Sequence, residues 1–425
     1  MIKKALKEGQ LYANYLGPSS ALLGNLIATP ILIANLGLKY WSLFALINIF
    51  LPLTFITLFG NAEIVKRLMI NIFLENNKSS ISINKFFIFE RKILIRFFPS
   101  IFILSFALIF FNSNNYQLID TFQISFILIS IAVFIKTFEF YYAEILNGLK
   151  QHYKLQISGF INTMIKWISI IYLSFLDEIN INILILTVIF FSIFTIVIQR
   201  IFIIDVFNKK NNFNQQLQEI KLEENENNFG FIILLILLLQ QFDKVLVFGI
   251  LDPLSLSYFG VAFLLSTAVP LILSPIIGYL TPEIYEKVEI NSTKRKKKFS
   301  QLIIIQFILM IITLGLVNLF LDKILIIWLG DDINSINISS FFIPLSIGTL
   351  SISLLNSMKI LFIAENKIIL MKKTLMLLFL IFLLLIIFLY LQKITVDIYL
   401  YCWSISMLAS IIYFYYIFFI RKYEK

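Results

Sequence analysis

Five charged residues lie inside stretches of sequence that are otherwise apolar. They are Lys136, Glu139, Lys166, Asp243 and Lys244. If they faced lipid at the centre of a membrane-spanning helix, each would cost about 2.5–3.5 kcal/mol, and together on the order of 12–18 kcal/mol. These side chains are therefore expected to face a water-filled cavity, a bound molecule or one another.

Two interpretations of these charges remain open. Lys136 and Glu139 are three residues apart, about one helical turn, so they can form a structural ion pair, and Asp243 can pair with a lysine of the other half of the chain. In the second interpretation, the excess of three lysines over two carboxylates lines a cavity for an anionic substrate. Lys359 is a weaker substrate-binding candidate, because it lies near the predicted end of its span, where a lysine side chain can reach the headgroups.

The composition excludes a soluble domain and most enzyme chemistry. Of 425 residues, 59% are hydrophobic and 14% are charged, and the mean hydropathy is +0.90. Soluble domains have roughly 45–50% apolar and 25% charged residues. The single Cys402 and single His152 cannot form a disulfide, a zinc site or a Ser–His–Asp triad. No phosphate-binding GxxxxGK[ST] motif is present, so we expect neither an enzyme nor a bound cofactor or metal.

Apolar windows of about 19 residues predict the elements that carry these charges. Each window has the roughly 20 residues that a helix needs to cross a bilayer. The sequence therefore predicts an all-α integral membrane protein with twelve transmembrane helices. The predicted spans lie near residues 11–36, 40–60, 93–111, 121–146, 157–176, 181–204, 229–250, 256–282, 300–321, 338–363, 368–391 and 396–420.

Basic residues predict the orientation of these helices. Nearly all loop lysines and arginines fall on one side, and only Lys39, Lys323 and Lys393 fall on the other. Because cytoplasmic loops retain positive charge, both termini are predicted to be cytoplasmic in a multi-pass membrane protein. The net charge of +10 is mostly this orientation signal, so we expect no nucleic-acid partner. The run KRKKK at 294–298 is typical of an anchor on anionic lipid headgroups.

Tryptophans give a second signal of the membrane boundary. Trp41, Trp328 and Trp403 fall at predicted outer ends of spans and fit an aromatic belt. Trp167 instead lies in mid-span beside Lys166, where packing or cavity lining would explain it. The outer connections are short, and the longer ones, near 112–120 and 322–337, are too small to fold as domains.

A polar linker at 207–228 predicts two lobes. The segments 1–206 and 229–425 each contain six predicted spans, so both enter the membrane in the same direction, as parallel repeats would. A shift of 218 positions also aligns the second predicted helix with the eighth. The matched pairs include Tyr40 with Tyr258, Pro52 with Pro270 and Gly60 with Gly278. Pro52 and Pro270 are therefore expected to kink their helices at equivalent depth.

The second predicted helix and its flanks carry a family resemblance. The segment GLKYWSLFALINIFLPLTFITLFGNAEIVKRL, at 37–68, resembles the opening signature of Wzx-type polysaccharide flippases, which belong to the superfamily of the MATE drug exporters. Gly37, Tyr40, Gly60, Lys66 and Arg67 fit that signature, while Trp41 and Ser42 replace a usual glycine. A later stretch, 240–263, also resembles the family, with Asp243, Gly249 and Tyr258 in the corresponding places.

This resemblance implies a transporter of O-antigen or capsule type. It would flip a polyprenyl-pyrophosphate-linked oligosaccharide to the outer leaflet of the bacterial inner (cytoplasmic) membrane by alternating access of two MATE-like lobes. The oligosaccharide would be used in lipopolysaccharide or other polysaccharide biosynthesis. Lys136, Lys166 and Lys244 would contact the anionic cargo, while Glu139 and Asp243 would act as coupling or gating carboxylates. Membrane lipids, a downstream polysaccharide polymerase and a coupling proton or sodium ion are the other implied partners.

Two rivals differ in sequence features that can be examined. A MATE-like cation-coupled drug exporter would favour carboxylates over lysines in the cavity, whereas this chain has more lysines. A membrane glycan polymerase or ligase would need a large acidic outer loop, and the short predicted outer connections offer no place for one.

Overall fold

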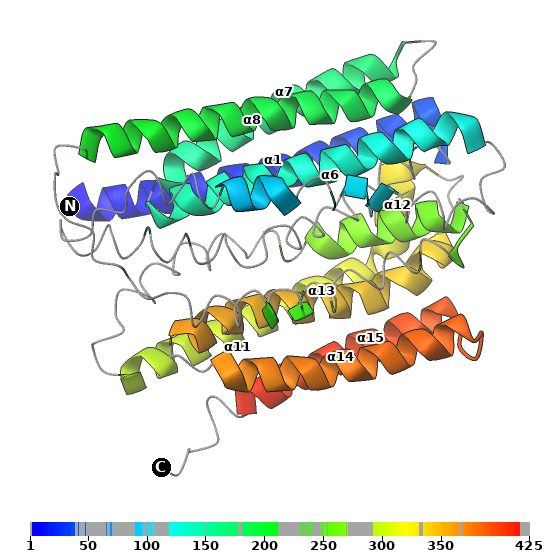
Figure 1. Cartoon of the computed structure of the whole chain (residues 1–425). Helices are drawn as coiled ribbons and strands as arrows, with labels where there is room; N and C mark the ends of the chain where they lie inside the picture. The colour runs from blue at the N-terminus through cyan, green and yellow to red at the C-terminus, as the bar shows by residue number, and fades with distance from the viewer. Residues whose placement is uncertain are drawn as a thin grey trace. The chain divides into compact units, whose positions relative to one another are not determined.

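The computed structural model describes most of the helices predicted above. It describes residues 2–38, 90–96, 119–149, 151–176, 181–210, 254–268, 292–330, 335–364 and 368–416, together with shorter stretches and single positions between them. The long described helices are α1 (Ile2–Leu36), α6 (Ile119–Gly148), α7 (His152–Ser174), α8 (Ile181–Lys210), α11 (Ser292–Leu319), α12 (Leu321–Leu329), α13 (Ser335–Ala364), α14 (Ile368–Tyr390) and α15 (Val396–Tyr415) (Figure 1).

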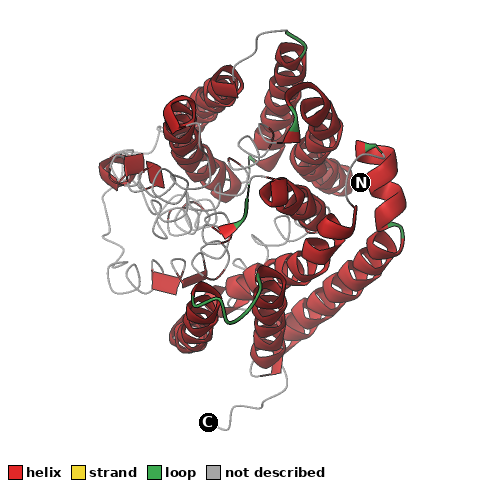
Figure 2. Ribbon diagram, turned by 90° about the vertical axis from the view of Figure 1, so that its right-hand side faces the viewer, coloured by secondary structure: helices red, strands yellow, loops and turns green. Residues whose placement is uncertain are grey.

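The predicted all-α membrane architecture is confirmed. The described residues form helices and loops only (Figure 2). Among them, seven helices are long and apolar enough to cross a membrane, or eight if the bent pair α11 and α12 is one span. The chain is therefore a multi-pass membrane protein. The predicted spans at 40–60, 93–111 and 229–250 lie largely outside the described residues, so the count of twelve stays a prediction.

The connection predicted at 322–337 is partly helical. α11 ends at Leu319 and α12 follows after Phe320, with an angle of 67° between the two helices. The segment LDKILIIWL places Leu321, Ile324 and Leu325 at the spacing of one helical face, and this pattern could have predicted the helix. Gly330 follows the last residue of α12, and its φ of 90° is in the left-handed region that favours glycine.

Two compact units divide the chain. Unit 1 comprises residues 1–237 and 244–254, and unit 2 comprises residues 238–243 and 255–425. Among α6, α7 and α8 of unit 1, the contact between α6 and α8 is the most extensive, that between α7 and α8 is intermediate, and that between α6 and α7 is the smallest. Among α13, α14 and α15 of unit 2, the contact between α13 and α15 is the most extensive, that between α14 and α15 is intermediate, and that between α13 and α14 is the smallest. Three consecutive helices in each unit thus share one packing pattern.

Polar contacts establish the direction of the helices in unit 1. The Nδ2 of Asn35 on α1 donates to the Oγ of Ser174 on α7 at 3.1 Å, and Gly17 on α1 lies against Gln156 nearer the start of α7. α1 and α7 therefore run parallel. α7 and α8 run antiparallel, because Asn162 bonds to Thr195 while Lys154, earlier in α7, lies 4.0 Å from Asp205, later in α8.

Small residues allow α1 to approach α7 closely. Ser20, Gly24 and Ala28 recur every four residues, and Ser20 and Ala28 are fully buried. A Cβ on Gly24 would lie 1.9 Å from Cδ1 of Trp167. The glycine is thus required by packing, as in the small-xxx-small interfaces of membrane helices.

Two of the three tryptophans expected in the aromatic belt are instead buried inside the protein. Trp41 is 2% exposed and Trp403 is 1% exposed. The Nε1 of Trp403 donates to the carbonyl oxygen of Leu239 at 2.9 Å, and its ring lies against Gly348 on α13. A belt residue must contact the headgroups, so the belt prediction is wrong for Trp41 and Trp403. Trp328 is half-buried.

Candidate functional site

The charges of α6 lie at the middle of a membrane-spanning segment. Lys136 is the central residue of the span Ile124–Gly148, and Glu139 lies one turn further along. The Nζ of Lys136 donates to an Oε of Glu139, and the two side chains are 19% and 24% exposed. The ion pair that their spacing allows is therefore formed, and the pair carries no net charge.

Lys166 adds a second lysine, from α7. It lies twelve residues after Lys154, at which its span begins, so it is about 18 Å along the helix axis. The charges of both Lys136 and Glu139 act on its ammonium group, so the three side chains form one electrostatic cluster. Two lysines and one carboxylate make up this cluster, which we call the α6–α7 cluster, so it holds one more basic group than acidic groups.

Trp167 holds the neighbourhood of Lys166 in place. The Nζ of Lys166 lies 5.1 Å from the centroid of the Trp167 ring, a distance at which a cation is attracted by the face of an indole. Trp167 is 7% exposed and packs on Gly24 of α1. Three helices, α1, α6 and α7, thus position the cluster, and packing is the role of the mid-span tryptophan.

The cluster can compensate an anionic group. Lys166 is half-buried, and the side chains of the Lys136–Glu139 pair are about one-fifth exposed. A phosphate or acidic sugar that loses water needs charge-assisted hydrogen bonds, which lysine ammonium groups donate. Glu139 already accepts from Lys136, so an incoming anion would compete with the carboxylate for that lysine.

The other predicted site residues have different positions. Lys359 on α13 is the last residue of the apolar span Asn337–Lys359 and belongs to unit 2, which fits a lysine whose ammonium reaches the headgroups. Pro270 is helical and half-buried. Lys244, Asp243 and Pro52 lie outside the described residues, so their predicted roles stay predictions.

A second polar cluster, centred on Glu90, was not predicted from the sequence. The hydroxyl of Tyr142 on α6 donates to Oε1 of Glu90, and Nη2 of Arg200 on α8 lies 3.6 Å from Oε2. Glu90 is 13% exposed and Arg200 is 45% exposed. No spacing rule in the sequence joins positions 90, 142 and 200.

Comparisons with solved structures identify the fold. A MATE transporter in complex with MaL6 matches with a TM-score of 0.60 and 13% identity, over 96% of this chain and 94% of that one. A Vibrio cholerae MATE transporter matches with a TM-score of 0.60 and 9% identity, over 97% and 95%. A MOP superfamily transporter from Pyrococcus furiosus, whose reversed binding-pocket polarity suggests a different function, matches with a TM-score of 0.57 and 12% identity, over 96% and 93%.

These matches show that the chain has the fold of MATE transporters of the MOP superfamily. They cover nearly the whole of this chain and of each matched chain. No family model matches the sequence, and no curated protein matches it.

Proposed function

We propose that this protein is a secondary transporter that flips a lipid-linked anionic oligosaccharide across the bacterial cytoplasmic membrane by alternating access. The MATE-type fold supports transport, and the α6–α7 cluster supports an anionic cargo. The choice of cargo rests on the position of Lys166. This lysine lies at mid-span near the Lys136–Glu139 pair, in which the carboxylate already accepts a hydrogen bond from Lys136.

The chemistry of the cluster fits a pyrophosphate or an acidic sugar better than a cationic drug. A cation entering beside Lys136 and Lys166 would meet two basic groups and one carboxylate. An anion would meet the same excess of basic groups, which favours its sign of charge, in a region where charges are weakly screened. The Pyrococcus furiosus transporter provides a precedent for changed pocket polarity on this fold.

Coupling belongs to the same proposal. Glu139 and, in the second lobe, Asp243 are the proposed gating carboxylates, with a proton or sodium ion as the coupling ion. Lys244 and Lys359 are the proposed cargo contacts besides Lys136 and Lys166. The lobes 1–206 and 229–425, joined by the linker 207–228, are the proposed moving bodies, and both termini are proposed to be cytoplasmic.

The experiment tests Lys166→Gln in a host strain that lacks the chromosomal gene. Lipid-linked sugars are extracted, and their leaflet is assayed by protection from a membrane-impermeant glycosidase. Glutamine keeps a hydrogen-bonding side chain but removes the charge, so we expect protected lipid-linked oligosaccharide to accumulate and surface glycan to be lost. Lys323→Gln is the matched control, because Lys323 is an exposed lysine of α12 and should leave export unchanged.

Three results would contradict the proposal. Normal surface glycan in the strain without the gene would exclude oligosaccharide flipping, and altered drug accumulation in that strain would favour the MATE-like drug exporter. Normal glycan with Lys166→Gln, at normal expression, would instead exclude the α6–α7 cluster as the cargo site. A polymerase or ligase is indicated if lipid-linked units reach the outer face but stay unpolymerised.

A further inference from the structure

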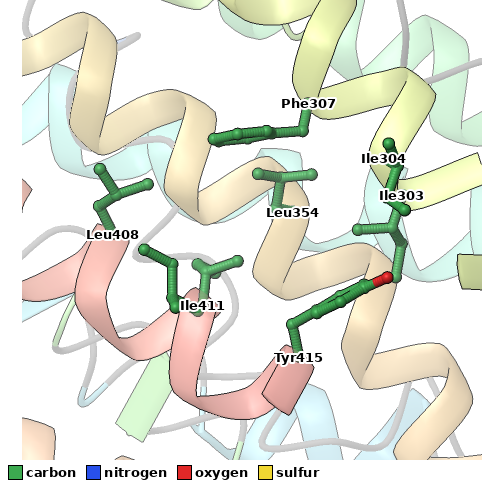
Figure 3. Close-up of a pocket in the computed structure, with 8 residues that line it drawn as sticks. Ile303, Ile304, Phe307, Leu354, Leu408, Ile411 and Tyr415 are labelled. Carbon is green, nitrogen blue, oxygen red and sulfur yellow. The ribbon is translucent and has the colours of Figure 1, made fainter. Parts of the chain in front are cut away.

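An apolar groove opens between three helices of unit 2 and contributes to neither cluster described above. Its volume is about 220 Å³, and its lining has no polar surface. The lining side chains converge from α11, α13 and α15 (Figure 3). They include Ile303, Ile304, Phe307, Leu354, Leu408 and Ile412.

The groove is open on one side. Ile304 and Ile412, at its rim, are 42% and 60% exposed, whereas Ile303 and Leu354 are 4% and 1% exposed. Its volume of about 220 Å³ is below the roughly 300–1,000 Å³ of pockets that enclose a whole drug-sized ligand. An apolar groove of this size in a membrane helix bundle suits one part of a larger molecule, a hydrocarbon chain held by van der Waals packing.

Positive charge lies at one end of the same helix. α11 begins at Ser292, and its first two turns contain the run KRKKK at 294–298. At 1.5 Å per residue, Lys298 is about 8 Å along the axis from Ile303 and about 14 Å from Phe307. One leaflet of a hydrocarbon core of about 30 Å is about 15 Å deep. An acyl chain of a phospholipid whose phosphate lies at the basic turns is therefore long enough to extend along the whole groove.

A hydrogen bond lies between the basic turns of α11 and the groove. The hydroxyl of Tyr415, at the end of α15, lies 2.6 Å from the Oγ of Ser300 on α11. The Tyr415 ring also lines the groove, so its polar end is directed to the level of the basic turns while its ring contributes to the apolar lining. The transition from polar to apolar contacts thus follows the order of headgroup and chain in a lipid.

We propose that this groove and the basic start of α11 form a binding site for an acidic phospholipid of the adjacent leaflet. One acyl chain packs in the groove, and the phosphate lies at residues 294–298. The charge of the basic run selects an acidic headgroup over a zwitterionic one. The site is independent of the proposed cargo, because it uses none of the residues of the α6–α7 cluster.

The test uses the purified full-length protein in detergent, with phosphatidylglycerol and phosphatidylcholine added in turn. Native mass spectrometry counts the lipids retained as a function of lipid concentration. Lys296→Gln, Lys297→Gln and Lys298→Gln are combined in one variant, and Ile304→Trp fills the groove in another. Ile305→Trp is the matched control, because Ile305 is 53% exposed on the same helix but does not line the groove.

We expect the wild-type protein to retain phosphatidylglycerol in preference to phosphatidylcholine. Each lysine near the surface contributes about fivefold in affinity at low salt, so the triple variant should lose about 100-fold for phosphatidylglycerol. The Ile304→Trp variant should no longer bind the lipid that the wild-type protein binds most tightly, whereas the Ile305→Trp variant should still bind it. Because the triple variant leaves the apolar core of the bundle intact, it remains informative if Ile304→Trp fails to fold.

Three outcomes would overturn this proposal. The first is equal retention of the two lipids by the wild-type protein, and the second is unchanged phosphatidylglycerol binding in the triple variant. The third is a dimer mass that disappears with Ile304→Trp, which would mean that a second copy of the chain covers the groove. None of these outcomes bears on glycan export, so this proposal and the proposed function can fail separately.

Discussion

The close contact between α1 and α7 allows a sharp test at Gly24. A Cβ at this position would lie 1.9 Å from Cδ1 and 2.2 Å from Nε1 of Trp167. Carbon atoms in contact are about 3.5–4.0 Å apart, so Gly24→Ala needs a displacement of nearly 2 Å. Trp167 is 7% exposed and lies beside Lys166, so it has little space into which to move.

The matched control isolates the steric cost. Gly159 lies on α7, and a Cβ there would meet nothing within 4 Å. Both Gly→Ala changes gain similar helix propensity, about 1 kcal/mol, so their difference reports overpacking alone. Overpacking in a tight interior costs about 1–3 kcal/mol, which changes the unfolding equilibrium by about 5- to 150-fold. Gly24→Ala should be less stable than Gly159→Ala by that amount.

The assay is unfolding of the purified protein from mild detergent by titration with sodium dodecyl sulfate. A double-mutant cycle adds Trp167→Leu, which removes the indole atoms that clash. The penalty of Gly24→Ala should then disappear. Equal stability of Gly24→Ala and Gly159→Ala, or a penalty that persists without Trp167, would refute the close approach of α1 and α7 at this position.

Two further predictions concern other close contacts. Gly348→Ala should destabilise the protein by about 1–3 kcal/mol relative to Gly315→Ala in the same titration. A Cβ at position 348 would lie 2.0 Å from Cζ3 of Trp403, whereas Gly315 faces open space. Equal stability of the two variants would contradict the close contact between Gly348 and Trp403. Glu90→Gln should lower stability by about 1 kcal/mol because Arg200 loses its carboxylate, and the loss should shrink in high salt. Thermal shift at two salt concentrations measures this, and an effect independent of salt would contradict an electrostatic origin.

The helices themselves were predictable because the membrane imposes a length and an apolar composition on each span. Predicted spans such as 181–204 and 396–420 coincide with α8 and α15, and Lys136 and Glu139 form the pair that their spacing allows. Local rules of this kind act within one helix, where a residue's neighbours are fixed by the 3.6-residue period. Lys166 comes near this pair only because α6 and α7 lie close together, and no rule that acts within one helix predicts that.

Long-range packing decided the rest. The sequence placed Trp403 at a membrane boundary, but tertiary contacts with Gly348 and the Leu239 carbonyl oxygen bury it. Glu90, Tyr142 and Arg200 come together only because their helices pack side by side. Hydropathy thus determined that the chain crosses the membrane and where, because the bilayer selects each segment independently. Which residues meet inside the protein depends on shape and close approach between helices, and only the tertiary structure decides that.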